Sequence, residues 1–215
     1  MANIQVVDNI KLNRKGLLAR DNTNRWVLLH RQQGEMGGAC AVYCLIMNLL
    51  ILGYISEEDI SIYNKTDRRT LRGKFINHFL ENQGFIRSGY SYITLAKEVR
   101  IYCRDLHTTR KNPKELDNKI EMITNYIEDN SPIIISVAYE GGAHALLAVG
   151  IESDEKDIIN KIFCLDPSEP SPKLAVWNCF IDVHKNKDKD YPFWYVTEKN
   201  SYSVTLDDMI LIKKK

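Results

Sequence analysis

The sequence carries almost no excess charge of either sign. Lysine and arginine together number 29 and aspartate and glutamate together number 28, which gives a formal net charge of +1 at pH 7. Proteins that bind nucleic acid or anionic membranes usually carry a basic excess or a basic patch. We therefore expect no nucleic-acid partner and no membrane partner.

A long uninterrupted apolar run is also missing. The longest run, Ala39–Gly53, contains Asn48 and is too short to cross a bilayer comfortably. The segment Met1–Gly16 has no apolar core of signal-peptide length, so we expect no targeting segment there. Internal repeats and low-complexity tracts are absent from the sequence as well.

Cysteines are few and irregularly spaced. The sequence has 5 of them, at Cys40, Cys44, Cys103, Cys164 and Cys179. An odd number with irregular spacing does not resemble a disulfide framework. Free thiols in a reducing compartment fit better, so we expect a cytoplasmic protein, with secretion by a leaderless route as the alternative.

The apolar content is sufficient for one folded domain. Of the 215 residues 44% are hydrophobic, which predicts a globular protein with a sizeable core. The polar stretches Asp21–Arg25 and Lys185–Asp190 are typical of surface loops, and neither is long enough to link two domains. We therefore expect a single domain over residues 1–215, with an oligomeric state that the sequence leaves open.

Helical patterns dominate the first half of the chain and strand patterns the second. After a short strand at Trp26–His30, helices are expected from Cys40 to about Gly53 and over Leu71–Asn82, Tyr92–Asp105 and Pro113–Glu128. Strands are expected over Pro132–Ala138, Ala145–Ile151, Ile159–Leu165, Leu174–Ile181, Phe193–Val196 and Ser203–Ile212. This order predicts an α+β fold: a helical lobe, about residues 1–130, packs its central buried helix on an antiparallel β lobe, about residues 131–215.

Cys40 is the candidate nucleophile. It lies between a glycine-rich turn, Gly34–Ala39, and a helix that is apolar nearly all round. Unpaired backbone N–H groups at the start of a helix stabilise a thiolate, which is the reactive form of cysteine. The alternative is a small core residue on a buried helix. Cys44 lies one turn further on, where no such N–H groups are free, and we expect it to pack in the core.

His144 is the candidate base for that thiol, because a thiolate nucleophile needs a proton acceptor and an orienting group. It follows the pair Gly141–Gly142 and opens an apolar strand that runs to Ile151. This position would hold the imidazole rigidly at the end of a sheet, beside a flexible turn. A purely structural histidine at a strand start is the alternative.

Asp166 is the candidate orienting group. It ends the strand Ile162–Leu165 and precedes Pro167. If this strand pairs antiparallel with the strand that His144 opens, the two chain ends meet and the carboxylate can bind the far nitrogen of the imidazole. The alternative is an Asp-Pro-Ser turn in which the carboxylate bonds its own backbone, and the two roles are compatible.

An anionic tetrahedral intermediate also needs hydrogen-bond donors. The backbone N–H of Cys40 could supply one, and the side-chain amide of Gln33 a second, with Gln32 as the competing candidate. Each glutamine taken singly is typical of an ordinary polar loop residue.

Three segments together resemble the papain-like cysteine peptidases. Gln33-Gly-Glu-Met-Gly-Gly-Ala-Cys40 is similar to their glutamine-to-cysteine segment, and Gly142-Ala-His144-Ala-Leu-Leu-Ala-Val-Gly150 to their histidine strand. Phe163-Cys-Leu-Asp166-Pro167 resembles the aspartate-proline segment of the double-glycine leader peptidases and their stand-alone bacterial relatives. The strand within Ser131–Ser136 is similar to the one that pairs with the histidine strand in that group.

The resemblance implies a helical lobe and a β lobe with the active site between them, and amide-bond cleavage through a thioester. It covers less than a third of the chain. Gln33 lies one residue further from Cys40 than is common in the family, and Ala41 stands where glycine or tryptophan is usual. Asn178 follows Trp177 but lies too far past His144 to resemble the family's orienting asparagine.

The leading hypothesis from the sequence is hydrolysis of a peptide or isopeptide bond in a peptide or protein substrate. In it Cys40 attacks, His144 transfers the proton, Asp166 orients His144, and Gln33 helps to hold the oxyanion. Acyl transfer of the arylamine acetyltransferase or transglutaminase kind uses the same residue types, and a catalytically silent binding module is a further alternative. We expect no cofactor and no metal, because Cys40 and Cys44 have no partner pair at zinc-like spacing.

Overall fold

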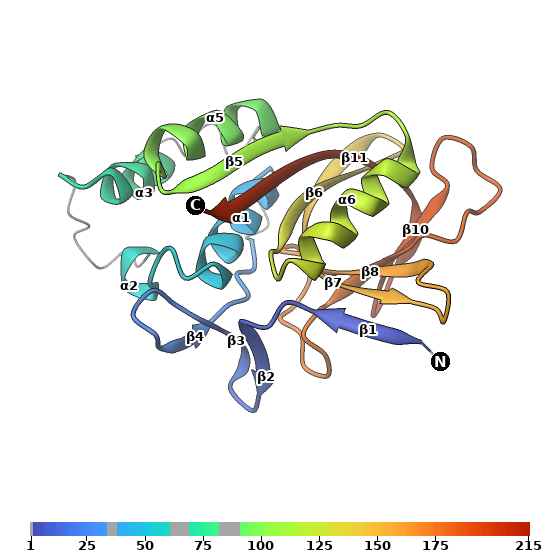
Figure 1. Ribbon diagram of the computed structural model, residues 1–215, viewed down its shortest axis with the longest axis horizontal. Helices are drawn as coiled ribbons and strands as arrows, with labels where there is room; N and C mark the ends of the chain where they lie inside the picture. Colours follow the sequence, from blue (N-terminus) through green and yellow to red (C-terminus); the bar gives the residue numbers. More distant parts are fainter. Residues whose placement is uncertain (1, 34–37, 61–68, 82–90) are drawn as a thin grey trace.

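The structure is a computed structural model of the chain that describes residues 2–33, 38–60, 69–81 and 91–215. Its helices and strands form a mixed α/β fold (Figure 1). The helices are α1 (Cys40–Ile51), α2 (Glu57–Ile60), α3 (Leu71–Glu81), α5 (Tyr92–Tyr102) and α6 (Leu116–Glu128). The strands are β1 (Asn3–Val6), β2 (Ile10–Asn13), β3 (Gly16–Arg20), β4 (Trp26–Leu28), β5 (Leu106–Lys111), β6 (Ile133–Tyr139), β7 (Gly142–Ser153), β8 (Ile159–Leu165), β9 (Cys179–Asp182), β10 (Phe193–Thr197) and β11 (Ser201–Lys214).

The larger sheet has 8 strands in the order β1-β7-β6-β11-β10-β9-β8, with β5 paired to β11. A further pairing between β7 and β8 closes the strands from β7 round to β8 into a ring. Every pairing is antiparallel. Helix α6 packs on β1, β6, β7 and β11, whereas α1 packs on β3, β6 and β7 (Figure 1). The ring therefore carries the start of β7 and the end of β8 side by side.

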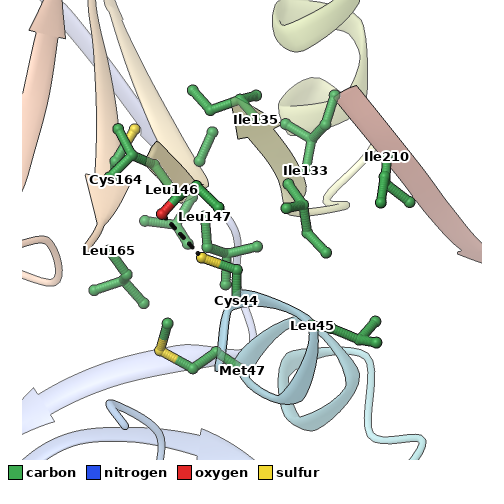
Figure 2. Packing of buried hydrophobic residues seen from close by; sticks show 14 of the residues in the cluster. Cys44, Leu45, Met47, Ile133, Ile135, Leu146, Leu147, Cys164, Leu165 and Ile210 are labelled. Carbon is green, nitrogen blue, oxygen red and sulfur yellow. Dashed lines mark hydrogen bonds between the residues drawn. The ribbon is translucent and has the colours of Figure 1, made fainter. Parts of the chain in front are cut away.

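Helix α1 is buried on almost every side, as its sequence predicted. Nine of its residues are buried, and all of them except Asn48 belong to the hydrophobic core formed with β6, β7 and β8 (Figure 2). Within this core the thiol of Cys44 donates a hydrogen bond to the carbonyl oxygen of Ala145 at 3.4 Å, so its expected packing role is confirmed. Among the described residues, no helix combines the length and the apolar character that crossing a membrane requires.

Two glycines are required by local geometry. Gly53 has a φ of +57° and lies just after α1, a left-handed conformation that favours glycine at a helix end. Gly150, in the middle of β7, faces the backbone of β1, and a Cβ there would lie 2.7 Å from the carbonyl oxygen of Gln5. The glycine that ends the His144 segment is therefore explained by the close approach of β1, which covers this edge of the sheet.

The expected helices from Leu71 onward and the later strands are confirmed, with differences of a few residues at their ends. The expected strand Leu174–Ile181 is shorter, since β9 begins at Cys179 and Leu174 is 98% exposed. All five helices of the described residues lie before residue 130, as expected, but this part of the chain also contains strands. Four strands precede α1, β1 joins the larger sheet, and β5 adds a fifth strand before residue 130. The two halves of the fold therefore do not separate at residue 130.

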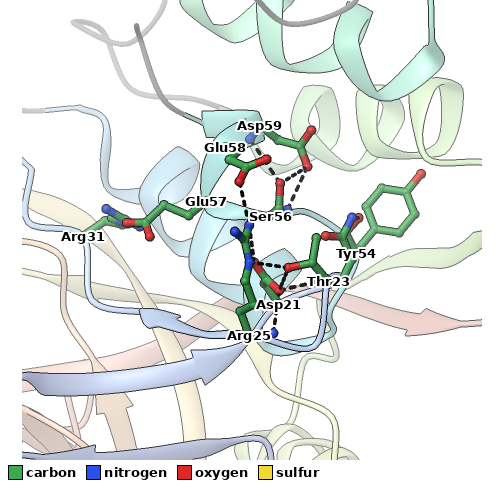
Figure 3. Close-up of polar contacts among 10 residues, drawn as sticks. Asp21, Thr23, Arg25, Arg31, Tyr54, Ser56, Glu57, Glu58 and Asp59 are labelled. Atoms are coloured by element: carbon green, nitrogen blue, oxygen red, sulfur yellow. Dashed lines mark hydrogen bonds and ion pairs between the residues drawn. The ribbon is translucent and has the colours of Figure 1, made fainter. Parts of the chain in front are cut away.

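Strands β2, β3 and β4 form a separate sheet whose last turn is tied to α2 (Figure 3). Asp21 accepts hydrogen bonds from the backbone N–H and the hydroxyl of Thr23, at 2.8 and 2.6 Å. Arg25 from the same turn pairs with Glu58 of α2 at 2.9 Å. The predicted surface loop Asp21–Arg25 is thus a turn, but Asp21 itself is buried. This turn directs β4 toward the segment that carries Gln33.

Candidate active site

Cys40 is the first residue of α1, and Ala39 before it makes no side-chain cap. In the first helical turn Val42 donates its backbone N–H to the carbonyl oxygen of Ala39 at 3.0 Å, whereas the backbone N–H of Ala41 stabilises a negative charge on the sulfur of Cys40. Of the glycine-rich turn before it, residues 34–37 lie outside the described residues, and Gly38 has a φ of +99°. The thiol is half-buried, and α1 holds it against the start of β7.

His144 is the third residue of β7 and lies opposite Val137 of β6. The turn before the strand contains Gly141, with a φ of +86°. The imidazole places Nε2 at 2.7 Å from Oδ1 of Asp166, and its side chain is only 13% exposed. Since Nε2 faces the carboxylate, Nδ1 is the nitrogen left for the thiol of Cys40.

Asp166 directly follows β8 and is 2% exposed. Strands β7 and β8 are antiparallel, with Leu147 opposite Leu165, so the start of β7 meets the end of β8 as the sequence predicted. Besides the imidazole, Oδ1 accepts the backbone N–H of Ser168 at 2.6 Å, and Oδ2 accepts the hydroxyl of Tyr195. The carboxylate therefore accepts the hydrogen bond from the backbone of its own turn and also binds the imidazole of His144.

The three side chains stabilise one another in their charged forms. Burial alone would raise the pKa of Cys40, but the hydrogen bond and charge of His144 outweigh it and lower the pKa below its ordinary value. Burial would lower the pKa of His144, but hydrogen bonds and charge interactions with Asp166 and Cys40 raise it to about 10. Burial likewise opposes the charge of Asp166, whose pKa is nevertheless lowered, chiefly by His144. Each of the three groups therefore favours the charged form of its neighbour: a thiolate, an imidazolium and a carboxylate.

Gln33 lies next to this cluster, on the side of the Asp166 turn. Its backbone N–H donates to the carbonyl of Pro167 at 2.8 Å, and its side-chain amide donates to the hydroxyl of Ser168 at 2.5 Å. That hydroxyl is 3.4 Å from Nε2 of His144. Gln32, in contrast, is exposed. The structure brings Gln33 to the histidine side of the cluster, with its amide donating to Ser168.

Sequence reasoning missed three residues that hold Asp166. Asn178 accepts the backbone N–H of Asp166 at 2.7 Å and donates to its carbonyl at 2.9 Å, and Nε2 of His30 also lies 2.9 Å from that carbonyl. Tyr195 binds the carboxylate itself. Asn178 follows a tryptophan whose ring stacks on Phe163 at 3.9 Å. The Trp-Asn pair was visible in the sequence, but only the pairing of β8 with β9 places it on Asp166.

A metal site requires several ligating side chains in one place, and the described part of the chain can be compared with that requirement. No group of three or more histidine, cysteine, aspartate and glutamate side chains there is placed to hold an ion. Cys40 and Cys44 differ in their surroundings, because Cys44 is fully buried and donates to a carbonyl.

A thiol, an imidazole and a buried carboxylate in contact define a site suited to thiol-dependent acyl chemistry. Residues 93–183 match the family model described as papain-like cysteine protease AvrRpt2, a span that includes His144 and Asp166 and is less than half of the chain. This match supports a cysteine peptidase of the papain-like kind. It does not point to the double-glycine leader peptidases.

Further comparisons add little to the family match. No curated protein matches the chain. Among solved structures, the crystal structure of UfSP from C. elegans is similar with a TM-score of 0.49 at 10% sequence identity. The similarity covers 99% of this chain and 34% of that one, so this chain spans about a third of the length of the UfSP chain.

Proposed function

We propose that this chain is a cysteine peptidase, a single papain-like domain over residues 1–215 that hydrolyses a peptide or isopeptide bond of a peptide or protein substrate. The observation that carries the proposal is the position of one imidazole. His144 lies between the carboxylate of Asp166, at 2.7 Å, and the thiol of Cys40 at the start of a buried helix. A nucleophile, a base and an orienting group in this order are what thiol hydrolysis requires.

The first chemical step begins with a proton transfer. Cys40 gives its proton to His144, a transfer that the lowered pKa of the thiol and the raised pKa of the imidazole favour, and the thiolate attacks the substrate carbonyl and forms a C–S bond and a tetrahedral oxyanion. When the oxyanion collapses, the C–N bond breaks and His144 gives its proton to the leaving amine. A thioester on Cys40 remains. Neutral His144 then takes a proton from water, the hydroxide adds to the thioester, and the C–S bond breaks to release the acid.

The oxyanion of each tetrahedral intermediate needs donors at the mouth of α1. The backbone N–H of Cys40 is one proposed donor, because it is the first N–H of the helix and has no intrahelical acceptor. The side-chain amide of Gln33 is the second. Its hydroxyl partner, Ser168, lies beside His144, so the amide would exchange this hydrogen bond for one to the substrate oxygen.

Peptide-library cleavage by the native protein, Cys40→Ala and Cys44→Ala tests the proposal. We expect cleavage by the native protein, none by Cys40→Ala, and retained cleavage by Cys44→Ala, which removes the same atom one turn further along the helix. Cleavage that survives in Cys40→Ala would reject the assignment. An acyl group that mass spectrometry finds on Cys40 and that passes to an amine rather than to water would indicate an acyltransferase instead. A native protein that neither cleaves nor acylates would be a binding module.

A further inference from the structure

The two carboxylate oxygens of Asp166 have different partners from different parts of the fold. Oδ1 accepts from Nε2 of His144 at 2.7 Å and from the backbone N–H of Ser168 at 2.6 Å. Oδ2 accepts from the phenolic hydroxyl of Tyr195. A carboxylate held at both oxygens cannot rotate about its bond to Cβ without losing one of these donors. The direction of Oδ1 toward His144 is therefore linked to the donor on Oδ2.

We propose that Tyr195 is a positioning residue of the active site: its hydroxyl holds Oδ2 of Asp166, so that Oδ1 stays directed at Nε2 of His144. Tyr195 does not touch the reacting atoms and acts only through Asp166 and His144. This role of Tyr195 rests on the proposed peptidase function only where the test measures activity.

The sheet fixes the position of this hydroxyl. Tyr195 lies in β10, with Ile181 of β9 opposite it on one side and Tyr202 of β11 on the other. Its residue is 2% exposed, and its ring lies 4.8 Å from the ring of Tyr202. A buried tyrosine hydroxyl normally finds a hydrogen-bond partner, and here that partner is the carboxylate of the candidate site.

The direction of the hydrogen bond follows from the surroundings. Burial, together with the nearby Cys179 and Asp166, raises the pKa of Tyr195 far above its ordinary value, so the hydroxyl keeps its proton and donates. A donor to the charged form lowers the pKa of a carboxyl group, and Tyr195 contributes in this way to Asp166 after the larger contribution of His144. Among the described residues, the groups whose pKa the charge of Asp166 shifts include His30, Cys44, His144, Cys179, Tyr195 and Tyr202.

Tyr195→Phe removes only the hydroxyl, and Tyr202→Phe is its matched control, since it deletes the same atom from the neighbouring ring. The direct readout is the pKa of Asp166, followed by carbon NMR of labelled aspartate carboxyl groups, which separates it from the titration of His30. We expect this pKa to rise in Tyr195→Phe and to stay unchanged in Tyr202→Phe. Peptidase activity should fall about 10- to 100-fold in Tyr195→Phe alone, and the acid limb of its pH profile should move to higher pH.

A second variant covers the case in which Tyr195→Phe does not fold. Incorporation of 3-fluorotyrosine at position 195 makes the phenol more acidic and the donor stronger, so the pKa of Asp166 should move down, opposite to its change in Tyr195→Phe. A native protein without hydrolytic activity would reject the proposed function, whereas the NMR comparison would still decide the role of Tyr195. An Asp166 pKa that is the same in all four proteins, or that moves equally in Tyr202→Phe, would overturn the proposal.

Discussion

A cysteine at the first position of helix α1 and a cysteine inside the helix have opposite pKa shifts. Cys40 begins the helix and Cys44 follows one turn later, so both thiols lie against the start of β7. Burial raises the pKa of Cys44 far above its ordinary value, and the charge of Cys40 adds to this. Burial also opposes the ionisation of Cys40, yet its pKa is lowered, chiefly by His144. Burial therefore does not distinguish the two thiols, whereas their hydrogen-bond partners do.

One residue of β7 makes the contrast especially clear. The backbone N–H of Ala145 stabilises the thiolate of Cys40, whereas the carbonyl oxygen of Ala145 accepts the thiol proton of Cys44 at 3.4 Å. A donor favours the charged sulfur and an acceptor favours the neutral one. The register between α1 and β7 thus separates a candidate nucleophile from a core residue.

Alkylation by iodoacetamide at pH 7 should show the largest difference between the two thiols. We expect Cys40 to react faster than an unperturbed thiol and Cys44 slower than Cys40 by on the order of 100-fold or more, because only Cys40 combines a thiolate with access. Mass spectrometry of peptides after timed quenching measures both rates in one sample. His144→Ala should slow Cys40 and leave Cys44 unchanged. Equal alkylation rates at Cys40 and Cys44 in the folded protein would contradict the predicted difference between the two thiols.

The three residues proposed to take part in the chemistry were easier to predict from the sequence than the residues that hold them in place. Cys40, His144 and Asp166 stand at the ends of long apolar segments, where a change in periodicity marks the boundary, and β7 and β8 follow each other along the chain. The meeting of His144 and Asp166 therefore needs only one antiparallel pairing, which the sequence indicated, whereas Cys40 also needs α1 to pack on β7.

Other parts depend on pairings between distant segments, which periodicity does not report. Tyr195 reaches Asp166 only because β8, β9 and β10 pair in order, and β1 meets β7 across most of the chain. Strands β2 to β4 are only 3 to 5 residues long, and β5, with the sequence Leu-His-Thr-Thr-Arg-Lys, has no apolar run. Burial of such strands by tertiary contacts outweighs their weak local pattern.

The proposed oxyanion donor, the side-chain amide of Gln33, can be tested by substituting Gln33 and its neighbour Gln32. Gln33→Ala should lower kcat about 100-fold or more if its amide binds the oxyanion, because one such donor contributes on that scale. Gln32→Ala, an exposed neighbour, should have little effect on kcat. Steady-state kinetics on one cleaved peptide, with thermal unfolding to check the fold, makes the comparison. The reverse order of the two effects would assign the oxyanion donor to Gln32.

The smallest predicted effect is the change of the free energy of unfolding with pH. It depends on whether Cys40 or His144 holds the proton that the two groups share. In the unfolded chain the imidazole loses its proton near 6.5 and a thiol near 9.0, so between these values the pair of groups holds one proton, on sulfur. In the folded protein His144 holds that proton until about pH 10. Folding therefore binds no net proton in the range just below pH 9 in which Cys40 is a thiolate and an unfolded imidazole is neutral, and the contribution of this pair to stability is constant there.

Above that range the folded protein and the unfolded chain bind different numbers of protons, so the free energy of unfolding depends on pH. Above pH 9 the folded protein holds more protons than the unfolded chain, so stability should fall by about 1 kcal/mol toward pH 10. In Cys40→Ala the plateau should disappear, because His144 alone then loses its contribution from pH 6.5 upward, whereas Cys44→Ala should keep the plateau. Urea unfolding of the three proteins from pH 5 to 10 measures the difference, and a plateau that persists without Cys40 would show that the two groups do not share the proton.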